Sequence, residues 1–150
     1  MTYKFQNINI TMFITEKDYI QVGAEALKIM QQSSEDNRLL AEQRAMSRIA
    51  GALRGRYDVE ATFAKEGAER DAELVGCATD IALYHMACSL PGRANLETRE
   101  ERYKAALDYL KEIQSGRSTP DAPTVTGPHG EEDYHNPVRY GSVKRNTYDW

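Results

Sequence analysis

The central part of the chain, residues 15–116, repeats its apolar residues at helical spacing. Residues that begin or end helices divide it into five stretches, two short and three long. Thr15 heads a weak capping box and opens the first short helix, which Gly23 is expected to end. A second short helix follows, and Ser33 and Ser34 then both offer an N-cap for a third helix that runs to about Arg54.

The last two helices differ in how much of their surface is apolar. The fourth, over about 68–90, is apolar on most sides, which is typical of a helix in the middle of a bundle. Its main stripe is formed by Leu74, Cys77, Ala78, Ile81, His85 and Cys88. The fifth, from Asn95 as N-cap to Gly116 as C-cap, has one narrow apolar face. The sequence therefore predicts an all-α fold, a small bundle of about five helices.

Segments of a different character flank this helical body. The leader, residues 1–14, nearly alternates apolar and polar residues, which favours an extended segment. We expect it either to lie along the surface of the body or to pair with a neighbouring subunit as an arm. The tail, residues 117–150, contains four of the five prolines and few aliphatic residues, so it cannot bury a core of its own and is expected to be extended.

The tail nevertheless carries residues of the kind that anchor protein interfaces. We expect another chain to order it through Tyr134, Tyr140, Tyr148, Trp150, Arg139, Lys144 and Arg145. The body contains a second candidate contact, formed by Arg54, Arg56 and Tyr57. It is interpreted as a helix end followed by a packed tyrosine, because capping accounts for it without a partner. The alternative is that this turn is a small basic protrusion that binds an acidic partner.

Composition excludes several classes of protein. The net charge of −4 argues against a general nucleic-acid-binding protein, which usually has a basic face. The chain has no apolar stretch of about 18 residues, so no membrane span is expected, and its first residues lack the apolar run of a signal peptide. Cys77 and Cys88 are too far apart in one helix to form a disulfide, and both are expected to be reduced thiols in the core.

The residues do not suggest catalysis. His85 is expected to be a core histidine, because it lies on the apolar face of the fourth helix. His129 and His135 flank the run Glu131-Glu132-Asp133, which is interpreted as a solvated acidic segment. Paired metal ligands, a phosphate-binding loop and nucleophile motifs are not found in the sequence. We therefore expect neither an enzymatic activity nor a metal or other cofactor.

Four segments of the body form an ordered set of motifs. They are Phe13–Ile20 (FITEKDYI), Gly51–Val59 (GALRGRYDV), Asp80–Met86 (DIALYHM) and Glu100–Leu110 (EERYKAALDYL). Their order and spacing resemble the Mu-like phage head–tail adaptor, or head-completion, family over residues 13–116. The chain departs from the family pattern in its leader, in its long aromatic tail, and in Asp58, where the family often has proline.

The resemblance implies a structural protein of the neck of a tailed phage. The subunit would dock as a ring of about twelve copies on the portal and send its C-terminal segment onto it. The implied partners are the portal protein, neighbouring copies of the chain and the next neck or tail-completion protein. Genomic DNA would pass through the channel without specific binding, and a membrane would not be involved. The implied location is the virion neck, after synthesis in the host cytoplasm.

Two alternative functions stay open. One is another neck protein, a stopper or a tail-completion protein, although stoppers are usually β-rich and the helical pattern argues against that. The other is a small host-directed protein whose tail captures a regulator. An oligomerisation assay would separate the host-directed protein from the neck proteins.

Overall fold

The computed structural model describes residues 13–92 and 95–126. Within these ranges six α-helices account for most of the secondary structure, joined by one short 3₁₀ helix and one isolated antiparallel bridge. The elements are α1 (Glu16–Val22), α2 (Ala24–Gln32), α3 (Glu35–Leu53), α4 (Val59–Phe63), η2 (Gly67–Glu69), α5 (Ala72–Ser89) and α6 (Leu96–Ser115). The predicted all-α fold is confirmed, with α4 as an additional short helix. Among the described residues, no helix is both long and apolar enough to cross a membrane.

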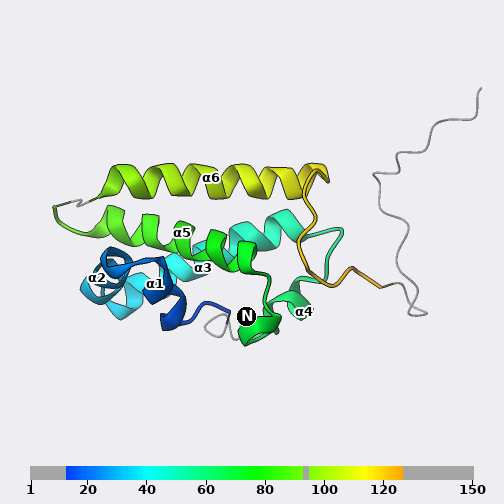
Figure 1. Ribbon diagram of the computed structural model, residues 1–150, viewed down its shortest axis with the longest axis horizontal. Helices are drawn as coiled ribbons and strands as arrows, with labels where there is room; N and C mark the ends of the chain where they lie inside the picture. Colours follow the sequence, from blue (N-terminus) through cyan, green and yellow to red (C-terminus); the bar gives the residue numbers. More distant parts are fainter. Residues whose placement is uncertain (1–12, 93–94, 127–150) are drawn as a thin grey trace, which may run out of the picture.

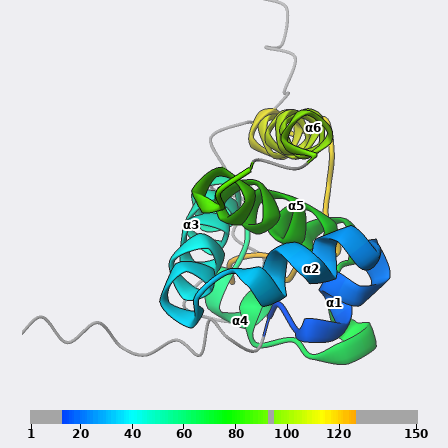
Figure 2. The same cartoon turned by 90° about the vertical axis from the view of Figure 1, so that its left-hand side faces the viewer.

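The three long helices form a layered bundle with α5 between α3 and α6 (Figures 1 and 2). α5 runs in the direction opposite to α3 and α6, as the colours in Figure 1 show. The two short helices α1 and α2 also pack against α5, and Gly23 lies between them at φ 143°. The prediction that the fourth helix occupies the middle of the bundle is therefore confirmed.

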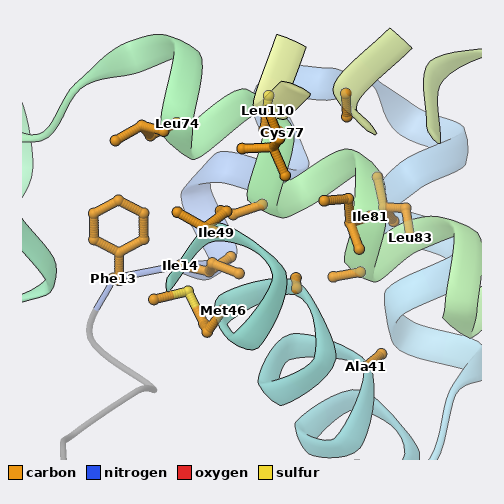
Figure 3. Close-up of a cluster of buried hydrophobic side chains, with 14 of the residues drawn as sticks. Phe13, Ile14, Ala41, Met46, Ile49, Leu74, Cys77, Ile81, Leu83 and Leu110 are labelled. Carbon is orange, nitrogen blue, oxygen red and sulfur yellow. The ribbon is translucent and has the colours of Figure 1, made fainter. Parts of the chain in front are cut away.

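The core is built around α5. Leu74, Ile81, Leu83 and Met86 of this helix are completely buried. They meet the apolar face of α3, including Met46 and Ile49, and side chains of α6 such as Leu110 (Figure 3). Because each partner helix contributes one apolar stripe and α5 contributes nearly its whole circumference, α5 contributes most to the hydrophobic stabilisation.

Two details of the fourth helix differ from prediction. It begins at Ala72 rather than near residue 68, because the carboxylate of Asp71 accepts a hydrogen bond from the backbone N–H of Leu74 at 2.8 Å and caps the helix there. One side of its last turn is not buried: Cys88 is exposed and His85 is only half-buried, whereas Met86 and Ala87 on the other side are buried. That turn lies beside the start of α3, where polar Asn37 donates a hydrogen bond to Ser89 at 2.7 Å. The expectation of a core thiol is thus wrong for Cys88 and right for Cys77.

The predicted caps mostly form. The Ser34 hydroxyl accepts from the Asn37 N–H at 3.3 Å, and the Asp18 carboxylate accepts from the Thr15 N–H at 2.7 Å. Gly116 ends α6 in the left-handed conformation, at φ 75°. Asn95 precedes α6 as predicted, but its backbone is left-handed and its side chain makes no capping hydrogen bond.

The start of the described chain is anchored in the body. Phe13 and Ile14 are buried, and the Phe13 ring lies 5.1 Å from the Phe63 ring, centroid to centroid. The guanidinium of Arg70 donates to the Phe13 carbonyl and to both carboxylate oxygens of Asp18, at 2.8 and 3.0 Å. Residues 1–12 lie outside the described residues, so the extended form of the leader stays a prediction.

Candidate interaction site at the base of the tail

The candidate residues of the sequence analysis fall into two groups. Those of the distal tail, namely Tyr134, Arg139, Tyr140, Lys144, Arg145, Tyr148 and Trp150, lie outside the described residues. Arg54, Arg56 and Tyr57 are described, and they lie in the turn between α3 and α4. The first residues of the tail, 117–126, are also described, and the structure places them against this turn.

Two backbone hydrogen bonds join the turn to the tail. The Asp58 N–H donates to the Pro123 carbonyl at 2.8 Å, and the Val125 N–H donates to the Arg56 carbonyl at 3.1 Å. Together they form the isolated antiparallel bridge between Tyr57 and Thr124. We call residues 117–126 the strap, because they run from the end of α6 across to the end of α3 (Figure 1).

The strap is held at further points along its length. Pro120 is buried, the Asp121 N–H donates to the Asp71 carboxylate at 2.8 Å, and the Asp121 carbonyl accepts from the Lys65 ammonium at 3.2 Å. Asp71 therefore uses one carboxylate oxygen to cap α5 and the other to bind the strap. The strap is therefore fixed to the body at several points along its length.

Arg56 and Tyr57 serve this arrangement. The Arg56 guanidinium donates to the Ile113 carbonyl at 3.3 Å, which satisfies a carbonyl in the last turn of α6. A Cβ atom at Gly116 would lie 2.7 Å from the same guanidinium and would displace it, and the φ of 75° at this position also favours glycine. Tyr57 is buried, as the interpretation of a packed tyrosine expects, whereas Arg54 is exposed. Of the three residues, only Arg54 presents its side chain fully to solvent.

A second surface feature lies between α3 and α5. An open groove of about 630 Å³ is lined by Leu40, Gln43, Arg44, Ser47, Arg48 and His85, and we call it the α3–α5 groove. Burial together with the positive charges of Arg44 and Arg48 lowers the pKa of His85, so the imidazole is neutral at neutral pH. The His85 ring also contacts Tyr103 edge-on, with centroids 5.7 Å apart. This groove was not predicted from the sequence, because His85 was expected to lie in the core, whereas it is half-buried.

The described residues include no group of three or more histidine, cysteine or carboxylate side chains that could bind a metal ion. Cys77 is buried, and burial raises the pKa of its thiol to about 12. A hollow of about 750 Å³ adjoins the Asp18–Arg70 ion pair and is open to solvent. The two charged groups bind each other, Arg70 also binds the Phe13 carbonyl, and Asp18 also binds the Thr15 N–H, so their arrangement is one of structural anchoring.

The chain matches no protein-family model, and no match to it was found among curated proteins or solved structures. The resemblance to head–tail adaptors consequently rests on the four sequence motifs alone and stays a prediction.

Proposed function

We propose that this protein is a structural head–tail adaptor of a tailed phage neck, which assembles as a ring on the portal and binds it through its tail. The observation that carries the proposal is the strap. A compact helical body fixes the base of a tail that is rich in proline and in interface-type aromatic residues. Such a body suits a protein that acts by assembly, because it presents a binding segment from a defined point.

The energetic argument for tail-mediated assembly comes from repetition. A single tail that becomes ordered on a partner loses conformational entropy and binds weakly by itself. When many tails extend from one ring, each binding event after the first is intramolecular, which raises the effective concentration of the remaining tails. The acidic net charge of −4 is compatible with a ring through which DNA passes, because a basic lining would bind phosphates.

The test is co-sedimentation with the portal ring encoded in the same genome. The full chain is compared with a chain that ends at Thr126, which keeps every hydrogen bond of the strap, and with the Tyr148→Ala/Trp150→Ala variant. We expect the full chain to bind in ring stoichiometry, the truncated chain not to bind, and the double variant to bind more weakly. Circular dichroism of all three proteins should show the same helical content.

A matched control for the aromatic variant is Val138→Ala/Val143→Ala, which shortens two aliphatic side chains in the same tail. This control should bind the portal like the unaltered chain. Equal binding by the truncated chain would show that the body docks and that the tail has another partner. If the full chain does not bind the portal at all, the adaptor proposal is wrong, and a host-directed binding protein becomes the better hypothesis.

A further inference from the structure

The α3–α5 groove has an unbalanced positive charge. Arg44 and Arg48 lie one turn apart on the exposed face of α3, and both are exposed. Within residues 13–92 and 95–126, neither guanidinium lies in an ion pair, whereas Arg38 of the same helix is paired with Glu42. The pKa of His85 is lowered mainly by burial, and the positive charges of Arg44 and Arg48 lower it further.

The groove is also partly apolar. Leu40 lies at its end with 46% of its surface exposed, one of few large aliphatic side chains so exposed among the described residues. A ligand that fits this surface would present two or three consecutive negative charges and an apolar or aromatic neighbour. The tail contains one such segment, Glu131-Glu132-Asp133-Tyr134.

We propose that Glu131-Glu132-Asp133 of the tail binds the α3–α5 groove of its own chain, with the carboxylates against Arg44 and Arg48. This inference goes beyond the proposed function and does not depend on it. The occupant is a segment of the same molecule, because the strap fixes the base of the tail beside the end of α3, the helix that carries both arginines.

The distances allow the intramolecular contact. Val125 is bound to Arg56, directly after the end of α3 at Leu53. From Leu53 back to Arg44 is about 14 Å along the helix at 1.5 Å per residue. Glu131 follows Val125 by six residues, which span about 20 Å when extended. The extended connection, which contains Gly127, Pro128 and Gly130, is therefore longer than the separation along α3 between the strap and either arginine.

DNA is a weaker candidate for the same groove. Two arginines neutralise about two phosphates, which gives little non-specific affinity at physiological salt. Two ion pairs at the surface are likewise weak between separate molecules. The tail has an advantage over a separate molecule, since its short connection holds the acidic run near the groove at an effective concentration in the millimolar range. Binding of the acidic run would leave the basic and aromatic residues from Arg139 to Trp150 available for another protein.

Nuclear magnetic resonance of the full chain tests the contact directly. Cys88 is exposed and lines a hollow of about 230 Å³ that adjoins the groove, so a nitroxide on this native thiol marks the site. Cys77 is buried and is not expected to react. We expect the nitroxide to broaden the amide signals of Glu131 to Tyr134, and the broadening to disappear in about 1 M salt, where the Debye length is about 3 Å.

Two full-length variants should abolish the broadening as well, one with Glu131→Gln/Glu132→Gln/Asp133→Asn and one with Arg44→Gln/Arg48→Gln. Matched controls are Lys144→Gln/Arg145→Gln in the tail and Arg54→Gln beyond the groove, which should keep it. Unchanged broadening in either groove-directed variant would overturn the proposal, because proximity would then not depend on these charges.

Two further outcomes would replace the occupant. Broadening of isotope-labelled chains by nitroxide on separate, unlabelled chains would place the tail of a second copy in the groove and would overturn the intramolecular contact. If a short DNA duplex shifts the Arg44 and Arg48 signals while the acidic run is never broadened, the groove binds nucleic acid and the proposal is wrong. Intramolecular broadening that does not change on dilution supports it.

Discussion

Replacement of Arg70 by methionine should destabilise the protein strongly, because this side chain connects three parts of the body. Its guanidinium donates to the Phe13 carbonyl and makes a two-pronged contact with the Asp18 carboxylate at 2.8 and 3.0 Å. The Arg70 side chain is 12% exposed and that of Asp18 7%. The Arg70→Met variant would remove one donor from the Asp18 carboxylate and one from the Phe13 carbonyl, beside side chains that are mostly buried.

The size of the effect follows from this burial. Removal of one partner of a buried ion pair costs about 3–5 kcal/mol, because the other charge is left uncompensated. Asp18 retains hydrogen bonds from the Thr15 N–H and hydroxyl, at 2.7 and 3.0 Å, which places the expected loss near the lower end, about 3 kcal/mol. For a chain of this size the melting temperature should fall by roughly 10 °C.

The effect should depend on pH in a defined direction. Burial raises the pKa of Asp18, but hydrogen bonds from Arg70 and Thr15 outweigh burial and lower it overall. A carboxyl with a lowered pKa stabilises the folded state above its unfolded pKa of about 3.9, and this contribution is lost as the pH falls through the folded pKa. Without Arg70 the pKa of Asp18 rises, so the two proteins should differ most at neutral pH and become more alike in acid.

Urea denaturation followed by circular dichroism, at about pH 7 and about pH 3.5, measures both quantities. Lys17→Met is the matched control, since it removes the same charge from an exposed neighbour of Asp18 and should change the free energy of unfolding by less than about 0.5 kcal/mol. A loss below about 1 kcal/mol for Arg70→Met, or an equal loss at both pH values, would refute the argument from the buried ion pair.

Glycine, core and thiol substitutions test the rest of the fold. Gly51 lies in an exposed part of α3 with space around it, so Gly51→Ala should raise the free energy of unfolding by about 1 kcal/mol through the better helix propensity of alanine. Gly116 has a φ of 75° and lies against Arg56, so Gly116→Ala should lower the free energy of unfolding by about 1–2 kcal/mol. Thermal melts measure both effects, and a shift of the melting temperature in the same direction for both variants would contradict these predictions. Ile81→Asp places a charge at a completely buried site of α5 and should lower the free energy of unfolding by roughly 4 kcal/mol or more. A cooperative thermal transition near that of the unaltered chain would contradict the burial of Ile81. A thiol reagent should modify Cys88 in the folded protein but Cys77 only on unfolding, and equal rates for the two would be inconsistent with their burial.

Much of the helical body was predictable because local signals fix it. Gly23, Ser34 and Gly116 mark helix ends through backbone conformation or capping, and each of these ends lies where predicted. α4 was missed because five residues are too few to show a helical period, and its main signal was Asp58, whose carboxylate accepts from the Ala61 N–H at 3.0 Å.

Features that depend on distant partners could not be predicted. Helical spacing shows on which face of a helix a side chain lies, but not whether a neighbouring helix covers that part of the face. Cys88 was therefore placed on the apolar stripe of α5 and expected in the core, although it is exposed. The Asp18–Arg70 pair joins residues 52 positions apart, and charges at that separation carry no local signal. The strap was assigned to an extended tail, although its prolines and Ala122 pack on the body.

The strap also determines how the protein responds to mechanical force. A pull on the chain beyond Thr126 acts first on the hydrogen bond from Val125 to Arg56, then on the one from Asp58 to Pro123, and only afterwards on Asp121. These bonds are loaded one after another, so they break at lower force than bonds loaded together. Release of residues 117–126 lengthens the tail by about 35 Å, at 3.3–3.6 Å per residue, before any force reaches α6. The strap therefore acts as an extensible element in series with the bundle, and tension on the tail releases the strap before it separates the helices.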